Sequence, residues 1–175
     1  MELGSSGSVV GVADMIVGKV AERRRITTFA LGSCIGLTMY DSFVKVGGML
    51  HYMLPQPGAD VLPAELNVAM YATTGVPMLL RKLQDLGLRK ERMVVCVAGG
   101  AEVLNDTSVF AIGQRNRTML RKIFWKDGTK VAAEDTGGNL ARTMTMDLDN
   151  GEVRIKTRLG EKVLWTPAGV PMKAR

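Results

Sequence analysis

Aromatic side chains, histidine and cysteine are all scarce in this sequence. Phe, Trp and Tyr make up 5% of the 175 residues, two cysteines are present, and His51 is the only histidine. Few aromatics disfavour a single-strand nucleic-acid binder, which needs stacking platforms for the bases. Two cysteines are too few for a disulfide framework. One histidine and two distant cysteines do not make the closely spaced ligands of a zinc site, so we expect no metal and no cofactor.

Long hydrophobic runs and a secretory signal are also missing. No apolar stretch approaches the ~20 residues that cross a bilayer. Residues 1–8 are rich in Gly and Ser and lack the basic and apolar regions of a signal peptide. We therefore expect a cytoplasmic protein with reduced thiols and no membrane insertion. The pairs Gly99-Gly100 and Gly137-Gly138 match neither the dinucleotide-binding nor the P-loop motif and are interpreted as turns.

The overall composition is that of one folded domain. Apolar residues make up 46% and charged residues 23% of the chain, which predicts a single domain over residues 9–175 after a mobile segment at 1–8. The formal net charge is +6. The positive charges are spread out, with dense spots only at 23–25 and 115–122. We interpret them as solvated or protein-docking faces, not as a nucleic-acid site.

The hydrophobic pattern alternates between strand and helix signals. Period-2 or β-branched apolar residues predict strands, and spacing near 3.6 residues predicts helices. The expected strands are 9–13, 15–20, 26–29, 35–40, 46–54, 92–98, 129–135, 143–148, 152–158 and 162–165, and the expected helices are 64–86 and 112–126. Pro77 should kink or split the first helix, and Asn150-Gly151 predicts a hairpin turn. This order predicts an α+β fold of packed mixed sheets flanked by helices.

The segments around Cys34 and His51 carry the candidate chemistry. Cys34 follows Gly32-Ser33 in a predicted turn, whose backbone N–H groups suit an oxyanion hole. Residues 37–50 form two apolar segments joined by a turn, and a hairpin there returns Cys34 and His51 to the same end. A thiol beside an imidazole is suited to nucleophilic acyl transfer. The alternative is that both are buried structural residues, as Cys96 in its apolar strand is expected to be.

A catalytic histidine needs a partner for its other ring nitrogen. Thr28, on the strand that leads into the Cys34 turn, is the candidate hydroxyl, and Asp41 and Asp60 are carboxylate alternatives. A short helix that starts at Cys34 is an alternative to a strand there, and a helix N-terminus would favour the thiolate.

Several motifs in order along the chain resemble the CheD family of chemoreceptor glutamine deamidases. They are Leu31-Gly32-Ser33-Cys34, Gly47-Gly48-Met49-Leu50-His51-Tyr52-Met53-Leu54-Pro55, Ala98-Gly99-Gly100-Ala101, Ile112-Gly113-Gln114-Arg115-Asn116, Glu134-Asp135-Thr136-Gly137-Gly138 and Arg142. The resemblance implies that selected receptor glutamines are hydrolysed to glutamate with release of ammonia. It further implies that Cys34, His51 and Thr28 are the catalytic cysteine, histidine and threonine. The implied fold is similar to that of toxin-type cysteine deamidases.

The resemblance also implies partners. Chemoreceptor cytoplasmic helices would be the substrate, and a CheC-type phosphatase would be a binding partner. The alternative function is a regulatory module that docks on that phosphatase or on receptors, with catalysis secondary. A cysteine peptidase is a third possibility, which the absence of chain cleavage would exclude.

Overall fold

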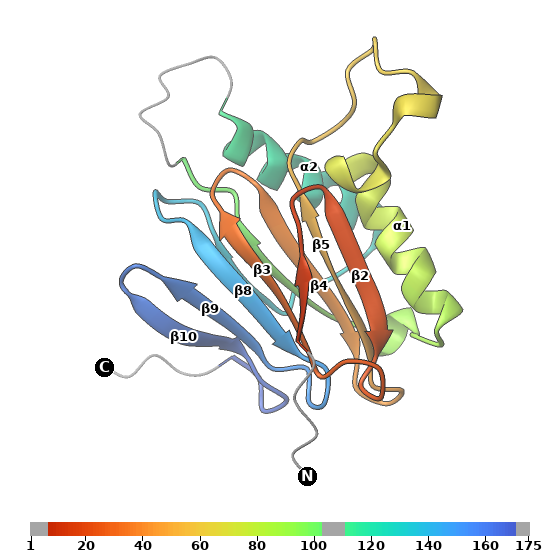
Figure 1. Ribbon diagram of the computed structural model, residues 1–175, viewed down its shortest axis with the longest axis vertical. Coiled ribbons are helices and arrows are strands. Elements are labelled where there is room, and N and C mark those ends of the chain that lie inside the picture. The colour runs from red at the N-terminus through yellow and green to blue at the C-terminus, as the bar shows by residue number, and fades with distance from the viewer. Residues whose placement is uncertain (1–6, 103–110, 171–175) are drawn as a thin grey trace.

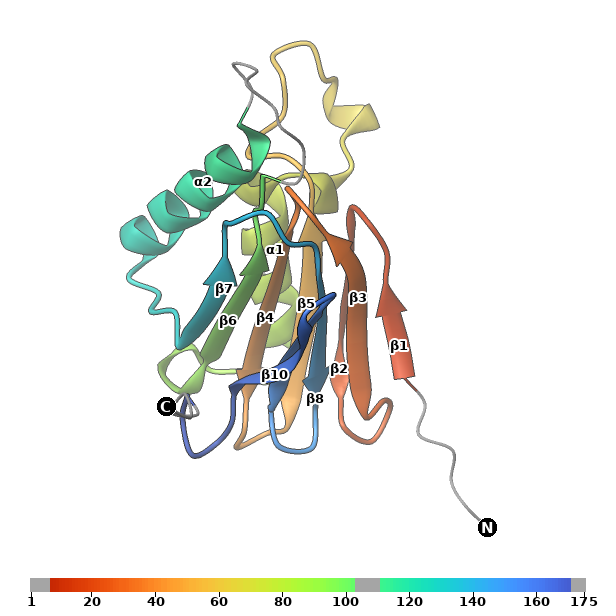
Figure 2. The same ribbon diagram turned by 90° about the vertical axis from the view of Figure 1, so that its left-hand side faces the viewer.

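The computed structural model describes residues 7–102 and 111–170, which form ten strands and two α-helices in three layers (Figure 1 and Figure 2). An outer sheet packs face to face on a central sheet, and both helices cover the other face of the central sheet. The strands are β1 (Gly7–Val10), β2 (Asp14–Lys19), β3 (Arg25–Leu31), β4 (Ile35–Asp41), β5 (Val46–Tyr52), β6 (Val94–Gly99), β7 (Ala133–Thr136), β8 (Arg142–Asp147), β9 (Val153–Thr157) and β10 (Gly160–Trp165). The helices are α1 (Ala72–Asp85) and α2 (Ile112–Asp127), with 3-10 turns η1 (Pro63–Glu65), η2 (Val68–Met70) and η3 (Lys90–Arg92).

Both sheets are mixed. The outer sheet has the order β1-β3-β8-β9-β10 and the central sheet the order β2-β5-β4-β6-β7. β1 runs parallel to β3 and β6 runs parallel to β7, while the other neighbours are antiparallel. The predicted α+β fold of mixed sheets flanked by helices is therefore confirmed. The likeness to toxin-type cysteine deamidases stays a prediction.

Two hydrophobic cores follow from this layering, because successive strand side chains point to opposite faces. The core between the sheets includes Ile26, Leu31, Met49, Met144 and Ile155. The core between the central sheet and the helices includes Leu37, Leu50, Tyr52, Leu79 and Phe124. The central sheet is thus buried on both faces, which explains the near-continuous apolar sequences of β4, β5 and β6.

Most elements lie where the sequence places them. Helix α2 matches its predicted range to within one residue and ends at Gly128, whose φ of +69° provides a left-handed C-cap. β6 and β7 begin later than predicted, at Val94 and Ala133. Residues 1–6 of the predicted mobile segment lie outside the described residues, whereas Gly7 and Ser8 belong to β1.

The first helix begins later than predicted. Residues 63–70 form the 3-10 turns η1 and η2, and α1 is one unsplit helix with Pro77 inside it. The expectation of a split helix is wrong. The reason is that Val76, Leu79 and Leu83 are buried against the central sheet, and this packing outweighs the roughly 3 kcal/mol that an interior proline costs.

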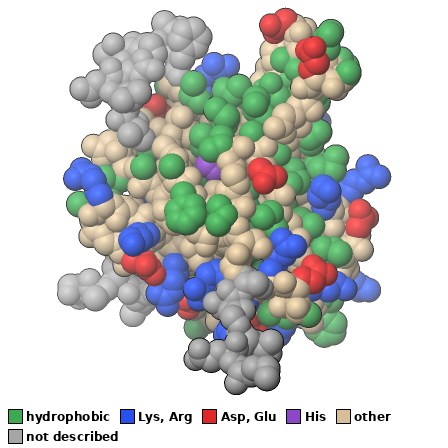
Figure 3. Space-filling model, in the orientation of Figure 1, with side chains coloured by type: hydrophobic (Ala, Val, Ile, Leu, Met, Phe, Trp, Pro, Cys, Tyr) green, Lys and Arg blue, Asp and Glu red, His purple; other side chains and the backbone are tan. Residues whose placement is uncertain are grey.

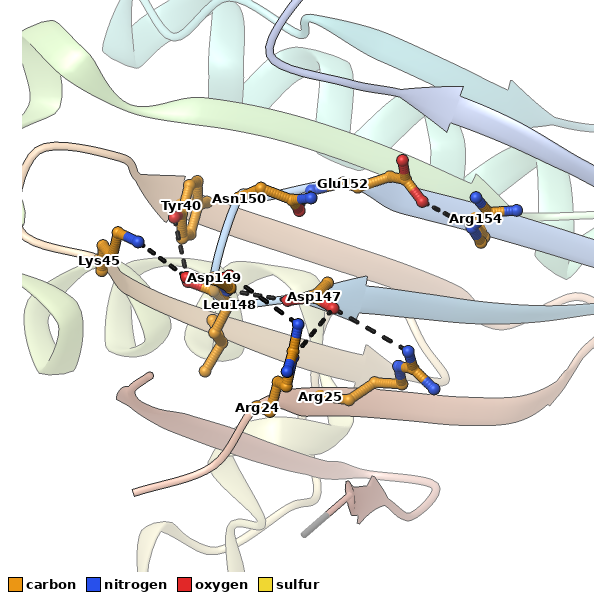
Figure 4. A network of polar contacts seen from close by, with 10 residues as sticks. All are labelled: Arg24, Arg25, Tyr40, Lys45, Asp147, Leu148, Asp149, Asn150, Glu152 and Arg154. Carbon is orange, nitrogen blue, oxygen red and sulfur yellow. Dashed lines mark hydrogen bonds and ion pairs between the residues drawn. The ribbon is translucent and has the colours of Figure 1, made fainter. Parts of the chain in front are cut away.

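The predicted hairpin at Asn150-Gly151 joins β8 and β9. Gly151 has a φ of +78°, and a Cβ there would collide with the ring of Tyr40, so the turn requires glycine. Tyr40 donates its hydroxyl to the Leu148 carbonyl at 3.0 Å, and Lys45 pairs with Asp149 at 2.7 Å (Figure 4). These contacts close the end of the sandwich where β4 ends and β5 begins.

Candidate active site

Strand alternation in β5 aims His51 into the space between the sheets. Met49 belongs to the core between the sheets, whereas Leu50 and Tyr52 face the helices. His51 therefore shares the face of Met49, and its side chain is completely buried. Gly36 of β4 stands directly opposite His51 in the antiparallel register.

A hydroxyl from the outer sheet meets this histidine across the interface between the sheets. Thr28 of β3 is completely buried, and its Oγ1 lies 2.8 Å from His51 Nδ1. The same hydroxyl lies 2.8 Å from the carbonyl oxygen of Val10, which pairs with Thr28 in the parallel β1–β3 register. A carbonyl only accepts, so the Thr28 hydroxyl donates to Val10 and accepts from the Nδ1–H of His51. This arrangement selects the tautomer whose Nε2 carries a lone pair.

The Nε2 atom of His51 is buried and has no hydrogen-bond partner among the described residues. Burial lowers the pKa of His51, because a buried imidazolium loses its hydration. The ring is thus neutral at neutral pH, with Nε2 available as a base.

The two carboxylate alternatives lie elsewhere. Asp41 is at the opposite end of β4, where Arg92 binds it at 2.7 Å and the backbone N–H of Phe43 donates to it. Asp60 lies in the segment between β5 and η1 and is exposed. The structure thus pairs His51 with Thr28 and not with either aspartate.

Cys34 immediately precedes β4, at the end of the hairpin where His51 lies. A strand, and not a helix, follows it. The segment before it is shaped by a bulge in β3, where the register shifts between Thr28 and Leu31 and Ala30 has a φ of +57°. Such bulges often redirect a chain next to active sites. The hairpin therefore brings Cys34 and His51 to the same end of the central sheet, as predicted, although no hydrogen bond joins them.

The two thiols differ in exposure. Cys34 is partly exposed and Cys96 is buried in β6. Burial raises the pKa of the Cys34 thiol, and its own backbone N–H lowers it by a smaller amount. For Cys96, burial raises the pKa to about 12, which makes this thiol inert at physiological pH. Cys34 is therefore the accessible sulfur, and it is a neutral thiol at rest.

The Cys34 segment is anchored by the turn that follows β6. The backbone N–H of Gly100 donates to the Cys34 carbonyl at 2.7 Å, and the N–H of Ala101 donates to the Gly32 carbonyl at 2.8 Å. Gly99 has a φ of +102°, and a Cβ on it would overlap the Cys34 carbonyl. The predicted turn at Gly99-Gly100 is therefore a support for the nucleophile segment.

Asn116 is a third support of the Cys34 segment, and the sequence did not predict this role. It projects from α2 and is completely buried. Its Nδ2 donates to the carbonyls of Ser33 at 3.0 Å and Met53 at 2.7 Å. The only signal in the sequence was its place at the end of the motif over 112–116.

The surface around the histidine is apolar on one side and carries an acidic residue on the other, because the exposed Asp14 of β2 pairs with His51 in the antiparallel β2–β5 register. Figure 3 shows His51 in purple next to hydrophobic side chains, with an acidic side chain close by. Phe29, next to Thr28, is 53% exposed, and Met53, two residues after His51, is 36% exposed. Phe29 and Met53 thus form an apolar rim on one side of the site.

Comparison with known proteins gives the family. The protein-family model described as "CheD chemotactic sensory transduction" matches residues 53–157 of this chain. A protein of Syntrophus aciditrophicus named "Probable chemoreceptor glutamine deamidase CheD 1" is 47% identical over 135 residues, which cover 77% of this chain and 84% of that protein. Two further proteins are named "Probable chemoreceptor glutamine deamidase CheD". The one from Solibacter usitatus is 41% identical over 156 residues, which cover 89% of this chain and 92% of that protein. The one from Desulforamulus reducens is 39% identical over 162 residues, which cover 90% of this chain and 95% of that protein. The chain belongs to the CheD family.

The matches differ in how much of the candidate site they contain. The CheD family model begins at Met53, so its match includes Asn116 but neither Cys34 nor His51. The Solibacter and Desulforamulus matches leave too few residues outside them to exclude the segment 28–51. The resemblance drawn from the motifs is confirmed at the level of the family.

Two kinds of feature are missing from residues 7–102 and 111–170. None of the helices there has the length and apolar character needed to cross a membrane. No three His, Cys, Asp or Glu side chains in this part gather closely enough to hold a metal ion.

Proposed function

We propose that this chain is a cysteine-dependent protein-glutamine deamidase that converts selected glutamines of chemoreceptors to glutamate. The observation that carries the proposal is the hydrogen bond between Thr28 and His51 Nδ1, which leaves Nε2 free as a base at the sheet end that holds Cys34. The names of the CheD relatives support chemoreceptors as the substrate.

Acylation begins with a neutral Cys34 thiol and a neutral His51 imidazole. As the Cys34 sulfur attacks the glutamine carboxamide carbon, His51 Nε2 accepts the thiol proton. The new C–S bond turns the carbonyl oxygen into an oxyanion, for which the backbone N–H groups of Ser33 and Cys34 are the proposed donors. The N–H of Gly32 already donates to the Ala30 carbonyl at 2.9 Å. The C–N bond then breaks, and the departing nitrogen takes the proton from His51 and leaves as ammonia.

Deacylation reverses the proton movements. Water attacks the thioester carbon while His51 Nε2 takes one of its protons. The C–S bond breaks, the sulfur of Cys34 recovers its proton from His51, and glutamate is released. One water is consumed and one ammonia is formed for each glutamine, with no redox change. Thr28 holds the imidazole in one tautomer through both steps.

The substrate of the proposed reaction lies on the cytoplasmic helices of the receptors, so we place the enzyme in the cytoplasm. Those helices are expected to be acidic, and the chain carries a formal charge of +6. Association should therefore be faster at low ionic strength. Binding rates that do not change with added salt would contradict this part of the proposal.

A CheC-type phosphatase is a further proposed partner, on the strength of family membership alone. If it docks over the same apolar rim, it should inhibit deamidation competitively with receptor fragments. The variant Cys34→Ala should still bind it, because the thiol is not needed for docking.

Mass spectrometry of receptor fragments tests the reaction. Wild-type enzyme should add about one dalton at selected glutamines without chain cleavage. Cys34→Ala should abolish the change, and Cys96→Ala is the matched control because its thiol is buried and inert. Cleaved fragments would indicate a peptidase. Full activity in Cys34→Ala would remove the proposal.

A further inference from the structure

Three consecutive carbonyls around the nucleophile each accept a hydrogen bond from another element. The Gly32 carbonyl accepts from Ala101 N–H at 2.8 Å and the Cys34 carbonyl from Gly100 N–H at 2.7 Å. The Ser33 carbonyl, between them, accepts from Asn116 Nδ2 at 3.0 Å. Two of the three donors are backbone groups of one turn, and the third is a side chain from α2.

Asn116 is itself held firmly. It is completely buried, and its amide also donates to the Met53 carbonyl at 2.7 Å, just after β5 ends. The hydroxyl of Tyr52 donates to the Asn116 carbonyl at 3.1 Å. Close packing of Gly113 on the carbonyls of residues 100 and 101 fixes the first turn of α2 on the same support. The asparagine amide therefore has a defined position relative to both catalytic segments.

The orientation of a carbonyl group fixes the direction of the N–H group in the same peptide unit. In a trans peptide the two groups point in opposite directions. The peptide whose carbonyl is bound by Asn116 carries the N–H of Cys34, so that N–H must point away from α2. Among residues 7–102 and 111–170, no group accepts a hydrogen bond from the N–H of Ser33 or Cys34. The Cys34 N–H belongs to the same residue as the nucleophilic sulfur.

We propose that Asn116 is a positioning residue that orients the Ser33–Cys34 peptide so that the Cys34 N–H is a donor to the oxyanion. This inference rests on the proposed deamidase function and assigns a residue on α2 to its transition state. The amide of Asn116 binds the carbonyls of Ser33 and Met53, and its proposed effect on the reaction passes through the first of these. Asn116 fixes the direction of the Ser33–Cys34 peptide dipole before the reaction. A donor that is already oriented stabilises the oxyanion without a reorganisation cost.

Two reactions of the same sulfur separate this role from a structural one. Deamidation passes through an oxyanion, whereas alkylation of Cys34 by iodoacetamide is a direct displacement that forms none. Asn116→Ala removes the donor to the Ser33 carbonyl. We expect kcat for deamidation to fall roughly 10- to 100-fold, which is at or below the loss of a whole oxyanion donor. KM and the alkylation rate should stay within about threefold of wild type, because neither depends on the oxyanion.

Two further variants complete the comparison. Asn116→Leu keeps nearly the volume of the side chain and has no donor, so it should repeat the fall in kcat if the alanine variant folds poorly. Tyr40→Phe is the matched control, because it removes another buried hydrogen bond to a carbonyl at the far end of β4. It should lower the melting temperature and leave kcat unchanged.

The outcomes are distinct. Equal losses in deamidation and alkylation, or wild-type kcat in both Asn116 variants, would overturn the role of Asn116. Absence of deamidation by the wild type would instead overturn the proposed function. Amide hydrogen exchange of the wild-type protein tests independently whether the Cys34 N–H is a free donor. The N–H of Cys34 should exchange faster than that of Ile35 in β4, and strong protection of the Cys34 amide would contradict a free donor.

Discussion

Replacing Thr28 by valine tests whether the cross-sheet hydrogen bond sets the tautomer of His51. Valine has nearly the shape of threonine, so the change removes the hydroxyl and leaves the packing. In the native protein the Thr28 hydroxyl donates to the Val10 carbonyl and accepts from Nδ1–H, both at 2.8 Å. Without it, a buried Nδ1–H and a buried carbonyl lose their partners.

The size of the effect follows from the cost of an unsatisfied buried donor. That cost is about 1–3 kcal/mol. In the native protein it falls on a ring protonated at Nε2, which has no partner among the described residues, and not on a ring protonated at Nδ1. Thr28→Val removes this preference, so the two tautomers should become comparably populated. A ring protonated at Nε2 is unable to accept the thiol proton of Cys34. The imidazolium that forms when His51 accepts the thiol proton also loses its Nδ1–H partner, and a hydrogen bond to a charged group is worth about 1 kcal/mol more than a neutral one. Together the two effects should lower kcat roughly 10-fold at about 1.36 kcal/mol per tenfold. Thr28→Ser keeps the hydroxyl and should retain most of kcat.

The assay combines kinetics with nitrogen NMR. Because His51 is the only histidine in the chain, its two ring ¹⁵N signals need no assignment by mutagenesis. In the wild type, Nδ1 should give the signal of a protonated ring nitrogen and Nε2 that of an unprotonated one. Thr28→Val should mix the two tautomers and reduce ammonia release. A wild-type ring protonated at Nε2, or a Thr28→Val enzyme with unchanged kcat, would refute the reasoning.

The remaining predictions concern pH and the supports of the site. Burial lowers the pKa of His51 and raises that of Cys34, so kcat/KM should be bell-shaped with its acid limb below about pH 6.5 and its alkaline limb above about pH 8.5; an acid limb above pH 7 would contradict this. Gly99→Ala should reduce both kcat and melting temperature because its Cβ overlaps the Cys34 carbonyl, whereas Gly138→Ala, with a φ of +64° and open space, should cost only about 1 kcal/mol of stability. Asp41→Asn should lower the free energy of unfolding by about 1–3 kcal/mol in chemical denaturation and leave kcat unchanged, because its ion pair lies at the other end of β4.

Local signals in the sequence were sufficient for most of the secondary structure. Strand alternation located β4 and β5, and a hairpin between them was enough to predict that Cys34 and His51 share one end. Helix α2 has both a clear period and a glycine stop, so its bounds were predicted closely. The start of α1 was missed because the 3-10 turns over 63–70 use residues that also suit a helix, and the packing that decides the matter is not local.

The contacts that give the site its chemistry are of another kind, because they join separate layers. Alternation in β5 predicts that His51 and Tyr52 point to opposite faces, but not which element covers each face. His51 meets Thr28 of the outer sheet, and Tyr52 meets Asn116 of α2. Each contact follows from a packing arrangement between layers, and no spacing along the chain encodes it.

This difference explains why one supporting residue was predicted and the other was not. Thr28 lies six residues before Cys34 on a strand that leads directly to it, so proximity along the chain was a usable guide. Asn116 reaches Ser33 across 83 residues of sequence, and it acts on a backbone carbonyl, which has no side-chain signature. An asparagine in an amphipathic helix looks like an ordinary surface residue until the helix is placed against the sheet. Position 116 of α2 is therefore where substitutions should separate the stability of the fold from the rate of the reaction.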